Sequence, residues 1–179
     1  DLDGAAALYR EALRACRETL GDRHQETLTR MSNLGGLLDD QGDLDGAAAL
    51  LREALQACRE TLGDRHPNTL TSRSNLGNVL QAQGDHDGAA ALHREALQAY
   101  RETLGDRHPS TLALINNLGS VLQDQGDLKG AAALLCEALQ ARRETLGDRH
   151  RDTLISINSL GLLLRAQGDL DGAAALHRE

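Results

Sequence analysis

The chain has 179 residues, of which 40% are hydrophobic but only 1% aromatic, with two Tyr and no Phe or Trp. Apolar content that comes mainly from Leu and Ala favours closely packed helices over sheets. The scarcity of aromatic side chains, on which bases could stack, and the net charge of −8 argue against a nucleic-acid partner. No apolar run is long enough to span a membrane, and the three cysteines have no zinc-type spacing. We therefore expect a reduced, cytoplasmic protein without a membrane partner.

A single period organises the chain. The sequence GDRH recurs at residues 21–24, 63–66, 105–108 and 147–150, and GAAAL recurs with the same spacing of 42 residues. This period predicts one array of repeats rather than a single globular core. The chain opens on Asp1 rather than Met and stops within a repeat, so we expect a fragment of a longer array. The predicted units are residues 1–42, 43–84, 85–126 and 127–168, with a partial unit at 169–179.

Each unit is predicted to contain two helices, which the second unit illustrates. Residues 46–62 carry apolar side chains at the spacing of one helical face, namely Ala47, Leu50, Leu51, Ala54, Leu55 and Cys58. Asp43 and Asp45 are candidate N-caps, and Gly63 stands where a left-handed C-terminal cap is expected. The next helix follows DRHPNT, with Pro67 in its first turn, and stops at Gly84. Neither helix can bury its stripe alone, so the units must stack into a solenoid.

Glycines inside the predicted helices indicate close packing. Gly35, Gly77, Gly119 and Gly161 occupy one repeat position, although glycine within a helix costs about 1 kcal/mol relative to alanine. We expect a close helix crossing at this position, with the alanines of GAAAL facing the glycine.

Residues 111–139 resemble a tetratricopeptide repeat (TPR), whose pattern contains an L-G step, alanines and a later aromatic residue. Leu118-Gly119 matches the L-G step, Ala131 and Ala138 match the alanines, and Leu135 replaces Phe. The period exceeds the usual 34 residues by 8, which is similar to the repeats of kinesin light chains and of arrays attached to some NACHT or NB-ARC proteins. The resemblance covers the whole chain and implies an all-α, right-handed solenoid of antiparallel helix pairs.

Polar residues replace the family's aromatic residues at two repeat positions. Arg73 stands where the family has Trp, and His93 where it has Phe. We expect both side chains to extend their polar ends to water.

Residues that change between repeats identify a candidate binding face. On the first helix of each unit they are spaced by three and four, which places them on one face. The resemblance implies that this face lines a concave groove for an extended peptide or a partner helix, and that asparagines at the N-L-G step hold the ligand backbone. The groove is expected to be mostly uncharged. Its predicted contact residues are Asn33, Ser74, Asn75, Asn78, Asn116, Asn117, Ser120 and Asn158.

Other chemistry has little support in the sequence. The GDRH histidines lie one repeat apart, too far to share a metal ion, so loop packing or capping is the expected role. Cys16 and Cys58 share a repeat position with Tyr100 and Arg142, which favours small apolar filler over a nucleophile. No phosphate-binding loop is present. We expect no enzyme activity, no metal and no cofactor.

Two functions remain open on the sequence alone. The first is a protein-interaction scaffold that binds a peptide or helix in the groove. The second is an assembly module in which the uncapped end of one copy docks head-to-tail on another.

Overall fold

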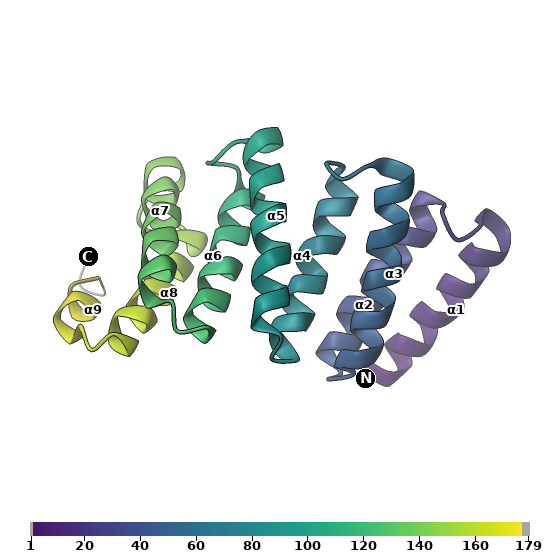
Figure 1. The fold of residues 1–179 in the computed structure, drawn as a ribbon, viewed down its shortest axis with the longest axis horizontal. Coiled ribbons are helices and arrows are strands. Elements are labelled where there is room, and N and C mark those ends of the chain that lie inside the picture. The colour runs from purple at the N-terminus through teal and green to yellow at the C-terminus, as the bar shows by residue number, and fades with distance from the viewer. Residues whose placement is uncertain (1, 177–179) are drawn as a thin grey trace. The chain divides into compact units, whose positions relative to one another are not determined.

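The computed structural model describes residues 2–176, and residues 1 and 177–179 lie outside the description. The described residues form nine α-helices and no strand (Figure 1). The first helices of the repeats are α2 (Gln25–Asp40), α4 (Pro67–Ala82), α6 (Pro109–Asp124) and α8 (Arg151–Ala166). The second helices are α1 (Leu2–Leu20), α3 (Leu44–Leu62), α5 (His86–Leu104) and α7 (Leu128–Leu146), followed by α9 (Leu170–Leu176). None of these helices is long and apolar enough to cross a membrane.

The chain divides into two compact units, residues 1–92 and 93–179, and the boundary falls within α5. In the first unit α2 packs against α1 and α3, and α4 packs against α3 and α2. In the second unit α7 packs against α6 and α8, α6 also contacts α8, and α9 packs against α8. Each unit therefore contains the sequential helix-pair packing of an all-α solenoid, as the repeat predicts.

The GDRH turn is built by local hydrogen bonds that recur in every copy. Gly63 ends α3 with φ of 86°, a left-handed conformation that glycine adopts without steric cost. His66 then caps α4, because its Nδ1 accepts the backbone N–H of Asn68 at 3.2 Å. Thr69 donates its hydroxyl to the Gly63 carbonyl at 2.8 Å. The capping role predicted for the GDRH histidines is confirmed, and His24, His108 and His150 make the equivalent bond.

The turn before each second helix is also set by a cap. Asp43 accepts the backbone N–H of Gly46 at 3.0 Å, which confirms it as the N-cap of α3, whereas Asp45 lies in the first turn. Pro67 takes the first position of α4 as predicted, and this helix ends at Ala82, just before Gly84 with φ of 85°. These caps give helices of 19 and 16 residues that alternate from α1 to α8.

The core of each repeat is thin and formed by small residues. Five members of the stripe predicted on α3 are buried, and Leu50 is half-buried. A Cβ added at Gly35 would lie 2.6 Å from the Leu51 Cγ, and one added at Gly119 would lie 3.0 Å from the Leu135 Cδ2. The close crossing is confirmed, but its main partner is the leucine at the family's Phe position. From the GAAAL segment, the Ala131 carbonyl oxygen lies 3.8 Å from the Cβ position at Gly119, farther than the Leu135 side chain.

The expectation that Arg73 and His93 reach water is wrong for both. Arg73 is 5% exposed, and its guanidinium ends on Asp64 rather than in solvent. His93 is 0% exposed, and neither ring nitrogen has a hydrogen-bond partner among the described residues. Burial lowers the pKa of His93 to about 4, so the ring is neutral at pH 7.

Ion pairs join successive second helices on the surface. Arg17 on α1 pairs with Glu53 on α3 at 2.7 Å, and Arg101 on α5 pairs with Glu137 on α7 at 2.6 Å. The GDRH arginine makes a similar contact, as in the 2.6 Å pair of Arg23 with Glu60. Exposed pairs of this kind are each worth about 0–1 kcal/mol, so they add little to the stability of the stack.

Candidate functional site

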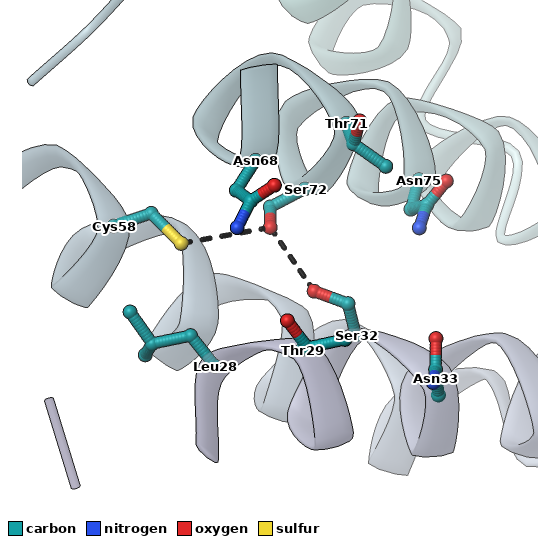
Figure 2. A pocket seen from close by; sticks show the side chains of 9 residues that line it. All are labelled: Leu28, Thr29, Ser32, Asn33, Cys58, Asn68, Thr71, Ser72 and Asn75. Carbon is teal, nitrogen blue, oxygen red and sulfur yellow. Dashed lines mark hydrogen bonds between the residues drawn. The ribbon is translucent and has the colours of Figure 1, made fainter. Parts of the chain in front are cut away.

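The first cavity lies in the first unit between α2 and α4, with α3 contributing to its floor. Its volume is about 100 Å³. Asn33 and Asn75, the N-L-G asparagines of consecutive repeats, stand on its two walls (Figure 2). The remaining lining residues are Leu28, Thr29, Ser32, Cys58, Asn68, Thr71 and Ser72. Most of these side chains carry a hydroxyl or an amide, so the cavity is polar and uncharged.

A chain of contacts crosses the floor of the first cavity. The hydroxyls of Ser32 and Ser72 lie 3.1 Å apart, and the Cys58 Sγ lies 3.9 Å from the Ser72 Oγ (Figure 2). Burial raises the pKa of the Cys58 thiol, and the contact with Ser72 opposes that shift only in part. A thiol with a raised pKa is protonated at pH 7, which fits packing rather than nucleophilic chemistry.

The second cavity occupies the corresponding place in the second unit, between α6 and α8, with α7 contributing to its floor. Its volume is about 660 Å³, several times that of the first cavity. Asn117 and Ser159 take the positions that Asn33 and Asn75 take in the first unit. The remaining lining residues are Pro109, Ser110, Ala113, Asn116, Ser120, Arg142, Asp152 and Ile155.

Charge distinguishes the second cavity from the first. Arg142 stands at the repeat position of Cys58 and is only 6% exposed. Its Nη1 donates to the Ser156 Oγ at 2.5 Å and to the Asp152 carbonyl oxygen at 3.2 Å. Burial lowers the pKa of Arg142, and the nearby Asp152 carboxylate opposes that shift. The groove is therefore not uncharged throughout, because this cavity contains one cation and one carboxylate.

The structure brings together five of the eight predicted contact residues in two separate groups. Asn33 and Asn75 line the first cavity, and Asn116, Asn117 and Ser120 line the second. Ser74 and Asn78 lie on α4, half-buried and exposed respectively, outside the lining of the first cavity. Asn158 lines a different hollow of about 540 Å³ with Leu154, Ile157 and Leu176.

Sequence reasoning missed the contributions of the second helices. Cys58 and Arg142 reach the two cavities from α3 and α7, whereas the predicted site was confined to the first helix of each unit. A signal was present, because Arg142 is the one charged residue among Cys16, Cys58, Tyr100 and Arg142 at this repeat position.

These observations define the class of protein as a solenoid of helix pairs with polar cavities between successive first helices. The family model for the tetratricopeptide repeat matches residues 1–60, 38–102, 73–144 and 110–179, which together span the chain. The chain belongs to the tetratricopeptide repeat family, whose members generally mediate protein–protein interactions. A comparison with curated proteins found no match.

Solved structures support the resemblance to kinesin light chains. The nearly identical TPR-like repeats of a putative kinesin light chain from Podosopora anserina are 26% identical, with a TM-score of 0.86 over 99% of this chain and 84% of that one. A variant of the same protein, solved separately, gives 25% identity and a TM-score of 0.89 over the same shares. BtubC (BKLC) from P. vanneervenii is 26% identical, with a TM-score of 0.86 over 98% of this chain and 70% of that one. The chain is thus similar to kinesin light chain-like repeat proteins.

Proposed function

We propose that the chain is a protein-interaction scaffold whose two polar cavities hold an extended peptide or a helix of a partner protein. The observation that carries the proposal is the pairing of residues at the N-L-G position of consecutive repeats around one cavity each, Asn33 with Asn75 and Asn117 with Ser159, where serine replaces asparagine. An asparagine amide donates and accepts hydrogen bonds at once, as a peptide backbone requires. Among the described residues, no Trp, Phe or Tyr side chain lines either cavity, so affinity would rest mainly on polar contacts.

A peptide screen followed by substitution tests this function. Peptides selected on the whole chain are measured by calorimetry against Asn75→Ala, Asn117→Ala and the double variant. We expect each single variant to weaken binding about fivefold to tenfold, because a hydrogen bond is worth about 1 kcal/mol. Gln56→Ala serves as the control, since Gln56 is exposed on α3 and lines neither cavity. Unchanged affinity of the double variant for every selected peptide contradicts the proposal.

We propose three further properties together with this function: no catalysis, no nucleic-acid partner and a cytoplasmic location. Cys58 lines the first cavity, and its thiol is protonated at pH 7 because burial raises its pKa. This favours a non-catalytic role without metal or cofactor. The net charge of −8 disfavours nucleic acid as a partner. We place the protein in the cytoplasm, as a single array of repeats.

Head-to-tail association of copies is a second candidate, favoured by one surface of α8. Leu154 is 52% exposed, whereas Leu28 and Leu112 at the same repeat position are 1% and 2% exposed. Arg149 beside it is the counterpart of Arg23, which pairs with Glu60. A second copy that brings an apolar side chain to Leu154 and a carboxylate to Arg149 would bury this surface.

Sedimentation over a range of concentrations separates the two candidates. Association that Leu154→Asp and Arg149→Glu both weaken supports assembly. A monomer at all concentrations removes the assembly function and leaves the scaffold function unaffected.

A further inference from the structure

The second cavity contains a buried donor that the fold does not require. Arg142 occupies a position where the chain elsewhere has Cys16, Cys58 and Tyr100, so the repeat packs without a guanidinium there. Among the described residues, both hydrogen bonds of Arg142 come from Nη1. A guanidinium carries five N–H donors, so Nη2 and Nε leave further donors for a ligand in the cavity that Arg142 lines.

The same cavity contains a buried acceptor without a partner. In the first unit a chain of contacts runs from Cys58 through Ser72 to Ser32 (Figure 2). The residues at the same three repeat positions in the second unit are Arg142, Ser156 and Asn116, in that order. Asn116 lines the cavity, yet its Oδ1 is buried and accepts no hydrogen bond from any described residue. Because an acceptor that is buried without a hydrogen bond is unfavourable, this atom favours a ligand that donates.

Charge decides which ligand fits the donor and the acceptor together. Arg142 and Asp152 carry opposite charges, so the lining of the cavity is neutral overall. A carboxylate would supply acceptors only and would face Asp152, and an ammonium would supply donors only and would face Arg142. A carboxamide supplies one C=O acceptor and an NH₂ donor without charge. We infer that the second cavity is a subsite for the side-chain carboxamide of a glutamine or asparagine in a bound peptide.

Size and apolar contacts agree with this ligand. The volume of about 660 Å³ admits a side chain, whereas the first cavity, with Cys58 at the equivalent position, has about 100 Å³. Ile155 and Ala113 are exposed on opposite walls of the second cavity, where they can contact the methylene groups of a glutamine. At the positions of Arg142, Ala113 and Ile155 the first cavity has Cys58, Thr29 and Thr71, so the subsite is specific to the second unit.

Capped amino acids test the subsite on the whole chain. The subsite deepens the proposed scaffold function and rests on it for its biological role, but the probes require no partner protein. N-acetyl-glutamine N-methylamide is titrated by NMR, with N-acetyl-glutamate and N-acetyl-leucine N-methylamides as matched probes. We expect the glutamine probe to shift the Arg142 Nε and Asn116 side-chain signals and to bind about tenfold more tightly than the other two.

Two variants that restore residues from other repeats serve as the matched substitutions. Arg142→Cys reproduces the position of Cys58, and Asn116→Ser that of Ser32, so the fold accepts both residues. Each is expected to abolish the preference for glutamine over leucine, with an unchanged far-UV CD spectrum. Equal or tighter binding of the glutamate probe overturns the carboxamide assignment, as does the absence of any shift at Arg142 and Asn116.

The subsite and the scaffold function can fail separately. A selected peptide that binds through Asn75 and Asn117 but shows no loss when its glutamines are replaced by glutamate or leucine overturns the subsite alone. Specific binding of the glutamine probe, with no peptide recovered from the screen, supports the subsite and counts against the scaffold.

Discussion

The guanidinium of Arg73 on α4 donates from Nη2 to the Oδ1 of Asp64, 3.0 Å away in the turn that precedes this helix. The Arg73 side chain is 6% exposed and that of Asp64 is 60% exposed, so a buried cation is held by a carboxylate at the surface. Asp64 also accepts from Nε of Arg59 at 2.8 Å. The turn thus serves both as a helix connection and as the counter-ion for a charged residue at a core position.

Replacing Arg73 by methionine is expected to leave stability unchanged or to raise the free energy of unfolding by about 1–2 kcal/mol. Met31 occupies the same repeat position and is 1% exposed, so the site accepts this shape. The variant removes the desolvation cost of the buried guanidinium, and replacing buried ionic groups by apolar residues of similar volume is often neutral or stabilising. Urea unfolding followed by CD measures the change, and a loss of more than about 1 kcal/mol contradicts the prediction.

Removing only the carboxylate should have the opposite effect. Asp64→Ala is expected to cost about 1–3 kcal/mol, because it weakens the solvation of a cation that stays buried. In the Arg73→Met background the same substitution removes only the exposed contact with Arg59, which is worth about 0–1 kcal/mol. A double-mutant cycle measures the difference, and equal costs in the two backgrounds would show that Arg73 does not depend on Asp64.

Adjacent glycines on α2 offer a test of the close helix crossing. A Cβ at Gly35 would lie 2.6 Å from the Leu51 Cγ, whereas a Cβ at Gly36 meets nothing within 4 Å. Gly36→Ala is expected to stabilise by up to about 1 kcal/mol through helix propensity. Gly35→Ala should cost about 1–2 kcal/mol net, because overpacking exceeds that gain. Equal effects on thermal unfolding contradict the crossing, and Gly119→Ala should fall between them, since its closest approach is 3.0 Å.

The GDRH turn could be predicted from sequence because its contacts are local. Glycine supplies the positive φ, and the histidine cap and the threonine hydroxyl bond span two and six residues. The same bonds form in every copy because the same residues recur at the same spacing. The second function of the turn was not predictable, since Asp64 accepts from Arg73 only in the repeat that has an arginine at that position.

Residues that differ from their counterparts in the other repeats were harder to predict, because the environment of such a side chain depends on packing. Solvation of polar ends is a sound expectation for Arg73 and His93, yet both are enclosed. The predicted binding face gave the walls of the two cavities but omitted Arg142, since this residue reaches its cavity from the second helix of the repeat. Periodicity identifies which face of a helix is buried, whereas the neighbour that a long side chain contacts is determined by the whole stack.

The histidine caps predict a measurable and selective loss of stability. His108 Nδ1 accepts the backbone N–H of Ser110 at 3.1 Å, so His108→Ala leaves that donor to water. We expect a cost of about 1 kcal/mol, which His108→Ser should largely restore because serine is a good N-cap. Urea unfolding of the two variants decides the point. If serine proves no better than alanine, the hydrogen bond contributes nothing and the histidine acts by packing alone.

The burial of His93 predicts a pH dependence of stability. Its pKa falls from 6.5 to about 4 on folding, so the unfolded chain binds the extra proton between these values. The contribution of neutral His93 to the free energy of unfolding is therefore fully present well above pH 6.5. It falls by roughly 3 kcal/mol as the pH drops toward 4. His93→Leu, matching buried Leu51 and Leu135, should remove this component, whereas His24→Asn, which keeps an N-cap acceptor, should retain it. Urea unfolding at pH 7.5 and 4.5 compares the three proteins, and an equal loss in His93→Leu would show that the acid sensitivity arises from other groups.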